Sequence, residues 1–211
     1  MNENNAINYL IIGAGGCGGS IGAFMAKAGK KVSFIARGAH KAAMKKDGLR
    51  LETTCQGKFD VKPVHVFDQE EYLVEIREGR ETVPDVIFVC VKFYSLQALV
   101  PFLKEICDPH TVVIPILNVF VTGQRLAQWL PGILVTDGCM YIAAEIRSPG
   151  HIVQKGDIFR VIFGVREQKD GGPVLKLVEK DLRDSGIDGV LSENIRYDAL
   201  MKFSLISPMA A

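Results

Sequence analysis

The chain has 211 residues, a hydrophobic fraction of 48% and a net charge of +1 at pH 7. This length and apolar content exclude intrinsic disorder and suit one large domain, or a domain and a half, with a proper core. The balanced charge gives no electrostatic reason to expect nucleic acid or an anionic membrane as the main partner. The sequence contains no run of about 18 apolar residues, so it predicts no membrane span.

The cysteines and histidines bear on metal and redox chemistry. Five cysteines are scattered along the chain without a Cys-x-x-Cys pair, and the four histidines are isolated from one another. This pattern predicts neither a disulfide framework nor a structural zinc site. We therefore expect no metal, and we expect a reducing, cytoplasmic location.

Two short apolar runs with a helical pattern between them come first. Residues 9–12 form a run that ends on glycine, and residues 32–36 form the next. Between them, apolar residues recur at i, i+3, i+4 and i+7 from Ile21, and Gly29 stands where helices commonly end. The pattern predicts a strand, an amphipathic helix and a second strand.

Two further apolar runs, residues 85–91 and 112–117, predict buried strands. Helical patterns follow them at 95–107, with an interruption near Pro101, and at 123–130. Strands that alternate with helices at this spacing indicate βαβ units and a parallel sheet that is covered on both faces.

The pattern changes after residue 133. Residues 134–146, 151–154 and 157–163 have the character of successive strands, with Ser148-Pro149-Gly150 as a turn between the first two. These strands are additional to the alternating βαβ pattern. We therefore expect an α/β fold with a Rossmann-type, doubly wound and mostly parallel sheet that carries extra strands.

One more helix is expected after these strands. Asp170 would cap it, Gly172 and Pro173 would lie in its first turn, and Gly186 would follow its end. No internal repeat or low-complexity stretch interrupts the order of the sequence.

The strongest chemical signal is a G-x-G-x-x-G motif directly after the first predicted strand and at the start of the first predicted helix. It is formed by Gly13, Ala14, Gly15, Gly16, Cys17 and Gly18. In such a motif the first glycine permits a tight turn, the second lets a pyrophosphate approach the backbone, and the third lets the helix pack on the strand. The diphosphate lies on unpaired N–H groups at the helix N-terminus. A flexible glycine loop is the alternative, and the flanking strand and helix favour the dinucleotide site.

The end of the second predicted strand indicates which dinucleotide is bound. An acidic residue about 20 residues after the glycines would favour NAD, but the strand ends Phe34-Ile35-Ala36-Arg37-Gly38 without one. Arg37 stands where it would meet a 2′-phosphate, which a guanidinium pairs with in a bidentate way. We therefore expect NADP(H) as the cofactor. A solvated surface arginine is the alternative.

Several landmarks give the chain a resemblance to the ketopantoate reductases (2-dehydropantoate 2-reductases). The resemblance begins with residues 13–18, 34–40 and 47–51, and it extends in the same order over almost the whole chain. The later landmarks are Val91-Lys92, Asn118, Arg125-Leu126, Ser148-Pro149-Gly150 and Lys202-Phe203. This ordered set is much more specific than the glycine motif alone.

The resemblance implies an NADP-dependent oxidoreductase that reduces a 2-oxo acid, 2-dehydropantoate or a similar branched compound, to the 2-hydroxy acid in pantothenate biosynthesis. Lys92 and Asn118 would contact cofactor and substrate at the carboxyl ends of their strands, and the backbone of Ala144 would touch the cofactor. Asn118 interrupts an apolar run, so its amide is expected to find hydrogen bonds. An exposed lysine and a turn-capping asparagine are the alternatives for Lys92 and Asn118.

Lys202 matches the catalytic lysine of the resembled family. Hydride addition to the C2 carbonyl of a 2-oxo acid builds negative charge on oxygen, which needs a proton or a cation nearby. An ammonium group in a partly desolvated cleft supplies both, and burial would lower its pKa. Lys202 would therefore be catalytic and would bind substrate together with Asn118. The alternative is a surface lysine whose alkyl chain lies along apolar neighbours.

The chain departs from the family pattern at several positions near the expected substrate. The family usually has Gly-x-Gly after the asparagine, whereas this chain has Val119-Phe120-Val121. The family also places asparagines four and eight residues after the lysine, where this chain has Ile206 and Ala210. These departures leave the identity of the 2-oxo acid more open than the type of reaction.

The last stretch of the sequence, residues 203–211, contains no charge. Since an all-helical second domain follows here in the resembled family, we expect residues 1–193 to form the NADP-binding domain and residues 194–211 to begin a truncated second domain. A small 2-oxo acid is the expected partner, without nucleic acid or membrane, and a homodimer stays open. A non-catalytic NADP-binding sensor or regulatory module is the alternative function, because the fold alone does not separate the two.

Overall fold

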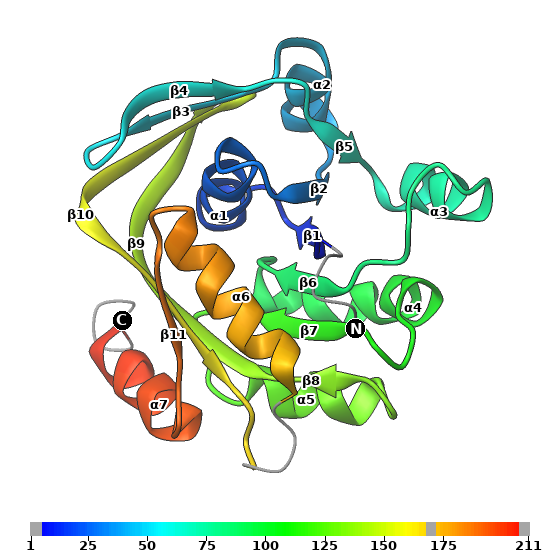
Figure 1. Ribbon diagram of the computed structural model, residues 1–211, viewed down its shortest axis with the longest axis vertical. Helices are drawn as coiled ribbons and strands as arrows, with labels where there is room; N and C mark the ends of the chain where they lie inside the picture. The colour runs from blue at the N-terminus through cyan, green and yellow to red at the C-terminus, as the bar shows by residue number, and fades with distance from the viewer. Residues whose placement is uncertain (1–5, 168–171, 207–211) are drawn as a thin grey trace.

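Two β-sheets with helix α1 (Gly16–Lys27) between them form the centre of the structure (Figure 1). The structure is a computed structural model that describes residues 6–167 and 172–206. A single cluster of buried side chains joins the three layers, with Ile11 from the first sheet, Phe24 from α1 and Ile152 from the second sheet. The core therefore lies around α1 and is shared by both sheets.

The first sheet has six strands, and every pair in it is parallel. In spatial order these are β5 (His65–Phe67), β2 (Lys31–Ile35), β1 (Asn8–Ile12), β6 (Val86–Val89), β7 (Val112–Pro115) and β8 (Leu134–Val135). The chain proceeds from β1 to β2 on one side and later returns to β6 on the other side. The connections after β1 and β6 therefore diverge, which is where open α/β sheets form a ligand crevice.

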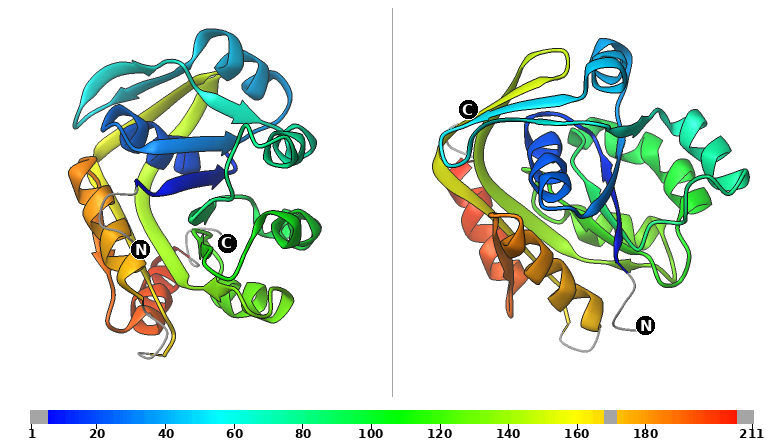
Figure 2. Two further views of the ribbon diagram at one scale, coloured as in Figure 1. Left: turned by 45° about the vertical axis from the view of Figure 1, so that its right-hand side comes forward. Right: turned by 45° about the horizontal axis from the view of Figure 1, so that its top comes forward.

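Alternate residues of the central strands face opposite sides of the first sheet. On β1, Tyr9 and Ile11 face α1, whereas Leu10 and Ile12 belong to a second buried cluster on the other side. That other side is covered by α3 (Gln69–Arg77), α4 (Leu96–Ile106) and α5 (Thr122–Trp129) (Figure 2). The predicted doubly covered parallel sheet is confirmed.

The second sheet contains the extra strands, and it wraps around α1 on the side away from α4 and α5 (Figure 1). Its members are β3 (Leu49–Thr53), β4 (Gly57–Val61), β9 (Asp137–Ser148), β10 (His151–Gly164) and β11 (Asp188–Leu191). Strand β10 is central, because it pairs with β3 and β11 in parallel and with β9 in antiparallel orientation. The sequence indicated extra strands but not that they form a separate sheet.

The predicted strand over 134–146 is divided at Thr136 between the two sheets. Before it, β8 pairs with β7 in the first sheet, and after it, β9 pairs with β10 in the second. The buried Thr136 still donates its N–H to the Val113 carbonyl oxygen at 3.0 Å. One extended segment thus serves both sheets, which continuous apolar patterning along the segment does not reveal.

The predicted strands over 151–154 and 157–163 are one strand, β10. Its pairing with β9 is irregular between Lys155 and Arg160, and Gly156 has a φ of +76° there. A left-handed residue at this point lets the strand bend without ending, because glycine adopts that conformation at little cost. The predicted break between the two strands is therefore an irregular point within one strand.

Two helices differ from their predicted form. Helix α4 runs through Pro101 without the predicted interruption, since its apolar face is buried on the first sheet and offsets the roughly 3 kcal/mol that an internal proline costs. Helix α6 (Pro173–Asp184) has Gly172 as its N-cap and Pro173 as its first residue, so the predicted cap, Asp170, is wrong and lies outside the described residues. The predicted end before Gly186 is confirmed.

A carboxylate on α6 ties that helix to the first sheet. The Tyr9 hydroxyl on β1 donates to Asp181 Oδ2 at 2.7 Å, and Lys30 Nζ, between α1 and β2, donates to Oδ1 at 2.6 Å. Burial and the neighbouring carboxylate raise the pKa of Tyr9 well above its ordinary value, so its hydroxyl stays a donor. Asp181 therefore connects three elements through two charge-assisted hydrogen bonds.

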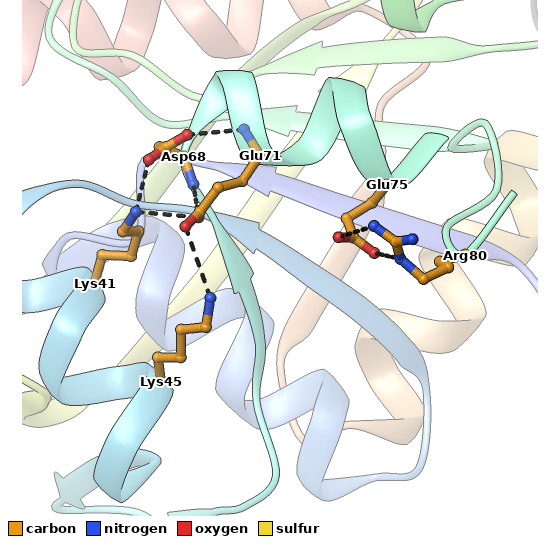
Figure 3. Close-up of polar contacts among 6 residues, drawn as sticks. All are labelled: Lys41, Lys45, Asp68, Glu71, Glu75 and Arg80. Carbon is orange, nitrogen blue, oxygen red and sulfur yellow. Dashed lines mark hydrogen bonds and ion pairs between the residues drawn. The ribbon is translucent and has the colours of Figure 1, made fainter. Parts of the chain in front are cut away.

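An ion cluster fixes helix α2 (Gly38–Asp47) to the start of α3 (Figure 3). Lys41 Nζ lies 2.6 Å from Asp68 Oδ2 and 3.0 Å from Glu71 Oε2, and Lys45 adds a pair with Glu71 at 3.7 Å. Asp68 and Glu71 also form a capping box at the N-terminus of α3. The cluster holds α2 in place beside the sheet.

Helix α7 (Ile195–Ile206) lies along β9 and β10 (Figure 1). None of the helices in the described ranges combines the length and the apolar content that crossing a membrane requires. The boundary at residues 193 and 194 stays a prediction.

Candidate active site

The carboxyl ends of β2, β1, β6 and β7 lie next to one another, and each is followed by a residue that the sequence singled out. In the order of the sheet these are Arg37, the glycine motif, Lys92 and Asn118. Neighbouring parallel strands present their carboxyl ends at one edge, so the residues form a row along this edge, across the place where the connections after β1 and β6 diverge. An extended ligand such as a dinucleotide suits this row.

Three glycines of the motif are required by close packing. Gly13 has a φ of +98°, and a Cβ on it would lie 2.8 Å from the Cys90 carbonyl oxygen. A Cβ on Gly18 would overlap the Gly13 carbonyl oxygen and lie 2.8 Å from Cys90 Cβ, and one on Gly16 would overlap the Ala144 carbonyl oxygen. The turn, the end of β6 and strand β9 therefore all press against the start of α1.

Gly15 differs from these three because space is open around it. It is the N-cap of α1, its φ of −72° is ordinary for any residue, and no atom lies within 4 Å of the position that a Cβ would take. The first N–H groups of α1 have no partners within the helix. A diphosphate fits this place, since the site combines free backbone donors, a helix N-terminus and room beside the backbone.

Helix α2 brings Arg37 and His40 to the glycine motif. Arg37 is the exposed N-cap of α2, and no carboxylate within the described ranges forms an ion pair with it. His40, in the first turn, has Nε2 at 2.8 Å from the Ala14 carbonyl oxygen, and its Nδ1 accepts a hydrogen bond from the Gly150 N–H at 3.0 Å. No role of His40 is evident from the sequence, although the residue lies within residues 34–40 of the family landmarks.

Lys92 and Asn118 are both exposed at the carboxyl ends of β6 and β7. Asn118 is exposed at the strand end, so water or a ligand can meet its hydrogen-bonding capacity, and the expectation that its amide finds hydrogen bonds stays a prediction. Lys92 is the N-cap of the short 3₁₀ helix η1 (Phe93–Ser95), and the Arg125 guanidinium lies 5.2 Å from the centre of the Phe93 ring. That cation–π contact joins η1 to α5.

Lys202 projects from α7 and is half-buried. Its Nζ lies 4.5 Å from the centre of the Tyr141 ring on β9. Burial lowers the pKa of the Lys202 ammonium below its ordinary value, although the nearby thiols of Cys139 and Cys17 oppose this. The direction of the shift agrees with the expectation for a lysine in a partly desolvated cleft.

One pocket brings Asn118 and Lys202 together. Its remaining lining residues come from the end of β7, the following loop, the start of α5, the start of β9 and α7, namely Pro115, Leu117, Val119, Phe120, Val121, Thr122, Gly123, Asp137, Gly138, Cys139, Ala199 and Phe203. Within it, Asp137 is paired with Arg166 at 3.1 Å and is not a free carboxylate. The pocket is therefore mainly apolar, with an amide and an ammonium as its functional groups.

The three residues that replace Gly-x-Gly form one wall of this pocket. Val121, the N-cap of α5, has a φ of +63°, a left-handed conformation that is unfavourable for a β-branched residue. The Phe120 ring packs on the Phe203 ring of α7 with 6.3 Å between their centres. The loop thus takes a backbone conformation suited to glycine but carries bulky side chains. The Ile206 side chain and Ala210 lie outside the described residues, so their effect on the pocket stays a prediction.

Cys17 lies in the glycine motif, and the charges of Lys92 and Lys202 both act on its thiol. Although the residue is exposed in part, desolvation of the thiol raises its pKa more than the two lysines lower it. Cys17 is therefore a neutral thiol rather than an activated nucleophile.

Comparisons with known proteins agree with this arrangement. The family model for ketopantoate reductase PanE/ApbA matches residues 9–168. A 2-dehydropantoate 2-reductase of Archaeoglobus fulgidus is 27% identical over 89% of this chain and 56% of its own length, and a Bacillus subtilis protein named "uncharacterized oxidoreductase YkpB" is 25% identical over 97% of this chain and 63% of its own length. The chain thus spans about three fifths of these relatives.

A solved structure shows the same fold. The crystal structure of 2-dehydropantoate 2-reductase from Porphyromonas gingivalis W83 superposes with a TM-score of 0.85 at 29% identity, covering 98% of this chain and 71% of that one. The matched family model covers most of the chain, from β1 to the end of β10. The chain belongs to the ketopantoate reductase PanE/ApbA family.

Proposed function

We propose that the chain binds NADP(H) and reduces a branched 2-oxo acid, such as 2-dehydropantoate, to the 2-hydroxy acid, a step of pantothenate biosynthesis in this family. The observation that carries the proposal is the placement of Asn118 and Lys202 in one apolar pocket, at the end of a row that begins with Arg37 and the glycine motif. We place the dinucleotide along the row and the 2-oxo acid beside its nicotinamide end, next to Asn118 and Lys202.

The cofactor assignment is supported by two features of the row. The open space at Gly15 and the free N–H groups of α1 would hold the diphosphate. Arg37 is exposed at the carboxyl end of β2, where its guanidinium would meet a 2′-phosphate. NADPH, when bound, supplies the hydride.

Lys202 has the properties of the proton donor in this reduction. Hydride addition at C2 leaves negative charge on the former carbonyl oxygen, and an ammonium group stabilises this charge and then transfers a proton to it. Burial lowers the pKa of Lys202, which makes its proton easier to transfer. Asn118, in the same pocket, would donate a hydrogen bond that orients the substrate.

The pocket wall supports a branched apolar substrate side chain. Val119 and Val121 stand where the family usually has glycines, with Phe120 between them, so apolar groups line the side of the pocket next to Asn118. Such a wall would pack against the branched hydrocarbon part of the substrate, and a substrate hydroxyl, such as that of 2-dehydropantoate, would face away from it, since a buried hydroxyl without a partner costs free energy.

The test is an assay of NADPH oxidation by the full-length natural protein with a panel of branched 2-oxo acids that includes 2-dehydropantoate. We expect turnover with at least one member, and a fall in kcat of about 10²–10⁴ in Lys202→Ala with nearly unchanged NADPH affinity. NADPH binding without turnover of any panel member would contradict the reductase and favour a sensor. An unchanged kcat in Lys202→Ala would remove this lysine from the mechanism.

A further inference from the structure

The hydrogen bonds of His40 fix the position of its ring hydrogen. Nδ1 faces the Gly150 N–H at 3.0 Å, and a backbone N–H can only donate, so Nδ1 is the unprotonated acceptor. The hydrogen of the neutral ring is then on Nε2, which donates it to the Ala14 carbonyl oxygen at 2.8 Å. Burial lowers the pKa of His40 and so favours the neutral ring that this pair of contacts requires.

The contact with Ala14 also orients the next N–H group. The Ala14 carbonyl and the Gly15 N–H belong to one trans peptide plane and point in opposite directions. Holding the carbonyl oxygen toward α2 therefore directs the Gly15 N–H away from α2. Within the described ranges no acceptor is found for this N–H, and the surroundings of Gly15 are open.

Further contacts hold both the helix that carries His40 and its hydrogen-bond partner Gly150. Lys41, the next residue of α2, is ion-paired to the start of α3 (Figure 3). Gly150 is buried, and its carbonyl oxygen accepts a hydrogen bond from the Arg50 N–H of β3 at 2.8 Å. The ring thus bridges the glycine motif and the β9–β10 turn, which are far apart in the sequence, and each of its anchors has further contacts of its own.

We propose that His40 is a positioning residue for dinucleotide binding, which holds the Ala14 carbonyl so that the Gly15 N–H is presented to a diphosphate oxygen. This inference rests on the proposed function, because it requires a diphosphate-containing ligand at the glycine motif. His40 acts through the backbone and does not touch the ligand. It therefore affects binding of ligands with a diphosphate and not of ligands without one.

Two substitutions separate the two hydrogen bonds of the ring. In His40→Gln, the amide nitrogen reaches about as far as Nε2 and can still donate to Ala14. In His40→Asn, the shorter amide places its oxygen near the position of Nδ1, where it can accept from Gly150, but it does not reach Ala14. A ring that only supports the β9–β10 turn predicts that Asn is the better replacement, whereas a ring that positions the glycine motif predicts Gln.

The experiment measures dissociation constants for NADPH and for adenosine 2′-monophosphate, which carries the 2′-phosphate but no diphosphate, together with thermal unfolding of each variant. We expect His40→Asn to weaken NADPH binding about tenfold and His40→Gln to weaken it less than about threefold. Binding of adenosine 2′-monophosphate should change less than about twofold in both variants, because it makes no use of the Gly15 N–H.

Three outcomes would overturn the inference: equal NADPH affinity in His40→Asn and the unchanged protein, a greater loss in His40→Gln than in His40→Asn, or a parallel loss for both ligands. Failure of the unchanged protein to bind NADPH would instead contradict the proposed function. The two failures are thus distinguishable by the unchanged protein alone.

Discussion

The glycines of the motif differ in what surrounds the missing side chain. A Cβ on Gly18 would overlap the Gly13 carbonyl oxygen, whereas the same position on Gly15 is free of atoms within 4 Å. Gly18 is therefore needed for the fold, whereas Gly15 leaves space that a ligand can occupy. Residue type alone does not distinguish the two.

We predict opposite effects for valine at these two positions. Gly15→Val should leave the free energy of unfolding within about 1 kcal/mol of its original value but weaken NADPH binding at least about tenfold, since the side chain fills the space beside the helix N-terminus. Gly18→Val should lower the free energy of unfolding by about 1–3 kcal/mol through overpacking. Urea unfolding and calorimetric titration measure both, and normal NADPH binding by a folded Gly15→Val protein would contradict the assignment.

Arg37 should determine the preference between the two nicotinamide dinucleotides. Only NADPH carries the 2′-phosphate, and a charge-assisted hydrogen bond contributes about 1.5–3 kcal/mol, so Arg37→Ala should reduce the preference for NADPH over NADH about tenfold or more. Arg77→Ala, an exposed arginine on α3, is the matched control and should leave the preference unchanged. Equal affinities of the unchanged protein for NADPH and NADH would refute the role of Arg37.

At the scale of the element, the start of α5 and the junction of α2 with α3 both depend on their end residues. Helix α5 begins on a left-handed valine, while α3 begins on a capping box that also receives Lys41 from α2. The first is an unfavourable conformation that the surrounding packing tolerates, and the second is a favourable cap. Substitutions at the two helix ends should therefore change stability in opposite directions.

Replacing Val121 by glycine should stabilise the protein. A φ of +63° costs a β-branched residue about 1–2 kcal/mol, and glycine avoids this cost but loses more entropy on folding. We expect Val121→Gly to raise the free energy of unfolding by up to about 1 kcal/mol. The matched control is Val119→Gly, a residue of nearly equal exposure (36% against 37%) without a positive φ, which should be neutral or destabilising. A loss of stability in Val121→Gly comparable to that of Val119→Gly would contradict the strain.

The α2–α3 cluster should make stability depend on pH on the acidic side. The backbone N–H groups of α3 and Lys41 lower the pKa of Asp68, so its contribution is present above its unfolded pKa, about 4, and is lost as the pH falls through the lower folded value. Asp68→Asn, which keeps a capping oxygen but no charge, should flatten this dependence, and Asp68→Ala should cost about 1 kcal/mol more. Urea unfolding at neutral and acidic pH measures both, with Asp60→Asn on the exposed edge of β4 as the control.

At the scale of the whole molecule, the two sheets are held together by the core around α1 and by α6. Helix α6 buries Val174, Val178 and Leu182 in that core, and Asp181 on the same helix binds β1 and the α1–β2 connection. The predicted site residues are spread over both layers, since Ala144 and Lys202 come from β9 and α7. Holding the layers in register therefore also maintains the site.

Loss of Asp181 should weaken this connection. Asp181→Ala leaves the buried Tyr9 hydroxyl without its acceptor and Lys30 with only its longer ion pair to Asp184 at 3.6 Å, so the free energy of unfolding should fall by about 2 kcal/mol. Asp184→Ala, one turn later and more exposed, is the control and should cost less than about 1 kcal/mol. Similar losses in the two variants by urea unfolding would show that Asp181 has no special role.

The sequence by itself determined the parallel sheet, the glycine motif and the family resemblance. The periodicity of strands and helices depends on residues that are close together in the chain. The same holds for the positive φ angles of glycines such as Gly13 and Gly29. The order of landmarks from the motif to Lys202 is likewise visible without coordinates. Each of these features depends on neighbouring residues or on the order of motifs, so it can be predicted from a single sequence.

Only the tertiary structure decided which strands form the second sheet, that Thr136 divides one segment between the sheets, and that His40 contacts the glycine motif. Sheet membership and such contacts depend on partners far apart in the sequence: His40 and Gly150 are separated by 110 residues. The pairing of remote backbone groups is set by the packing of whole layers, because each donor must find an acceptor once buried. Local periodicity does not indicate which remote backbone groups pair.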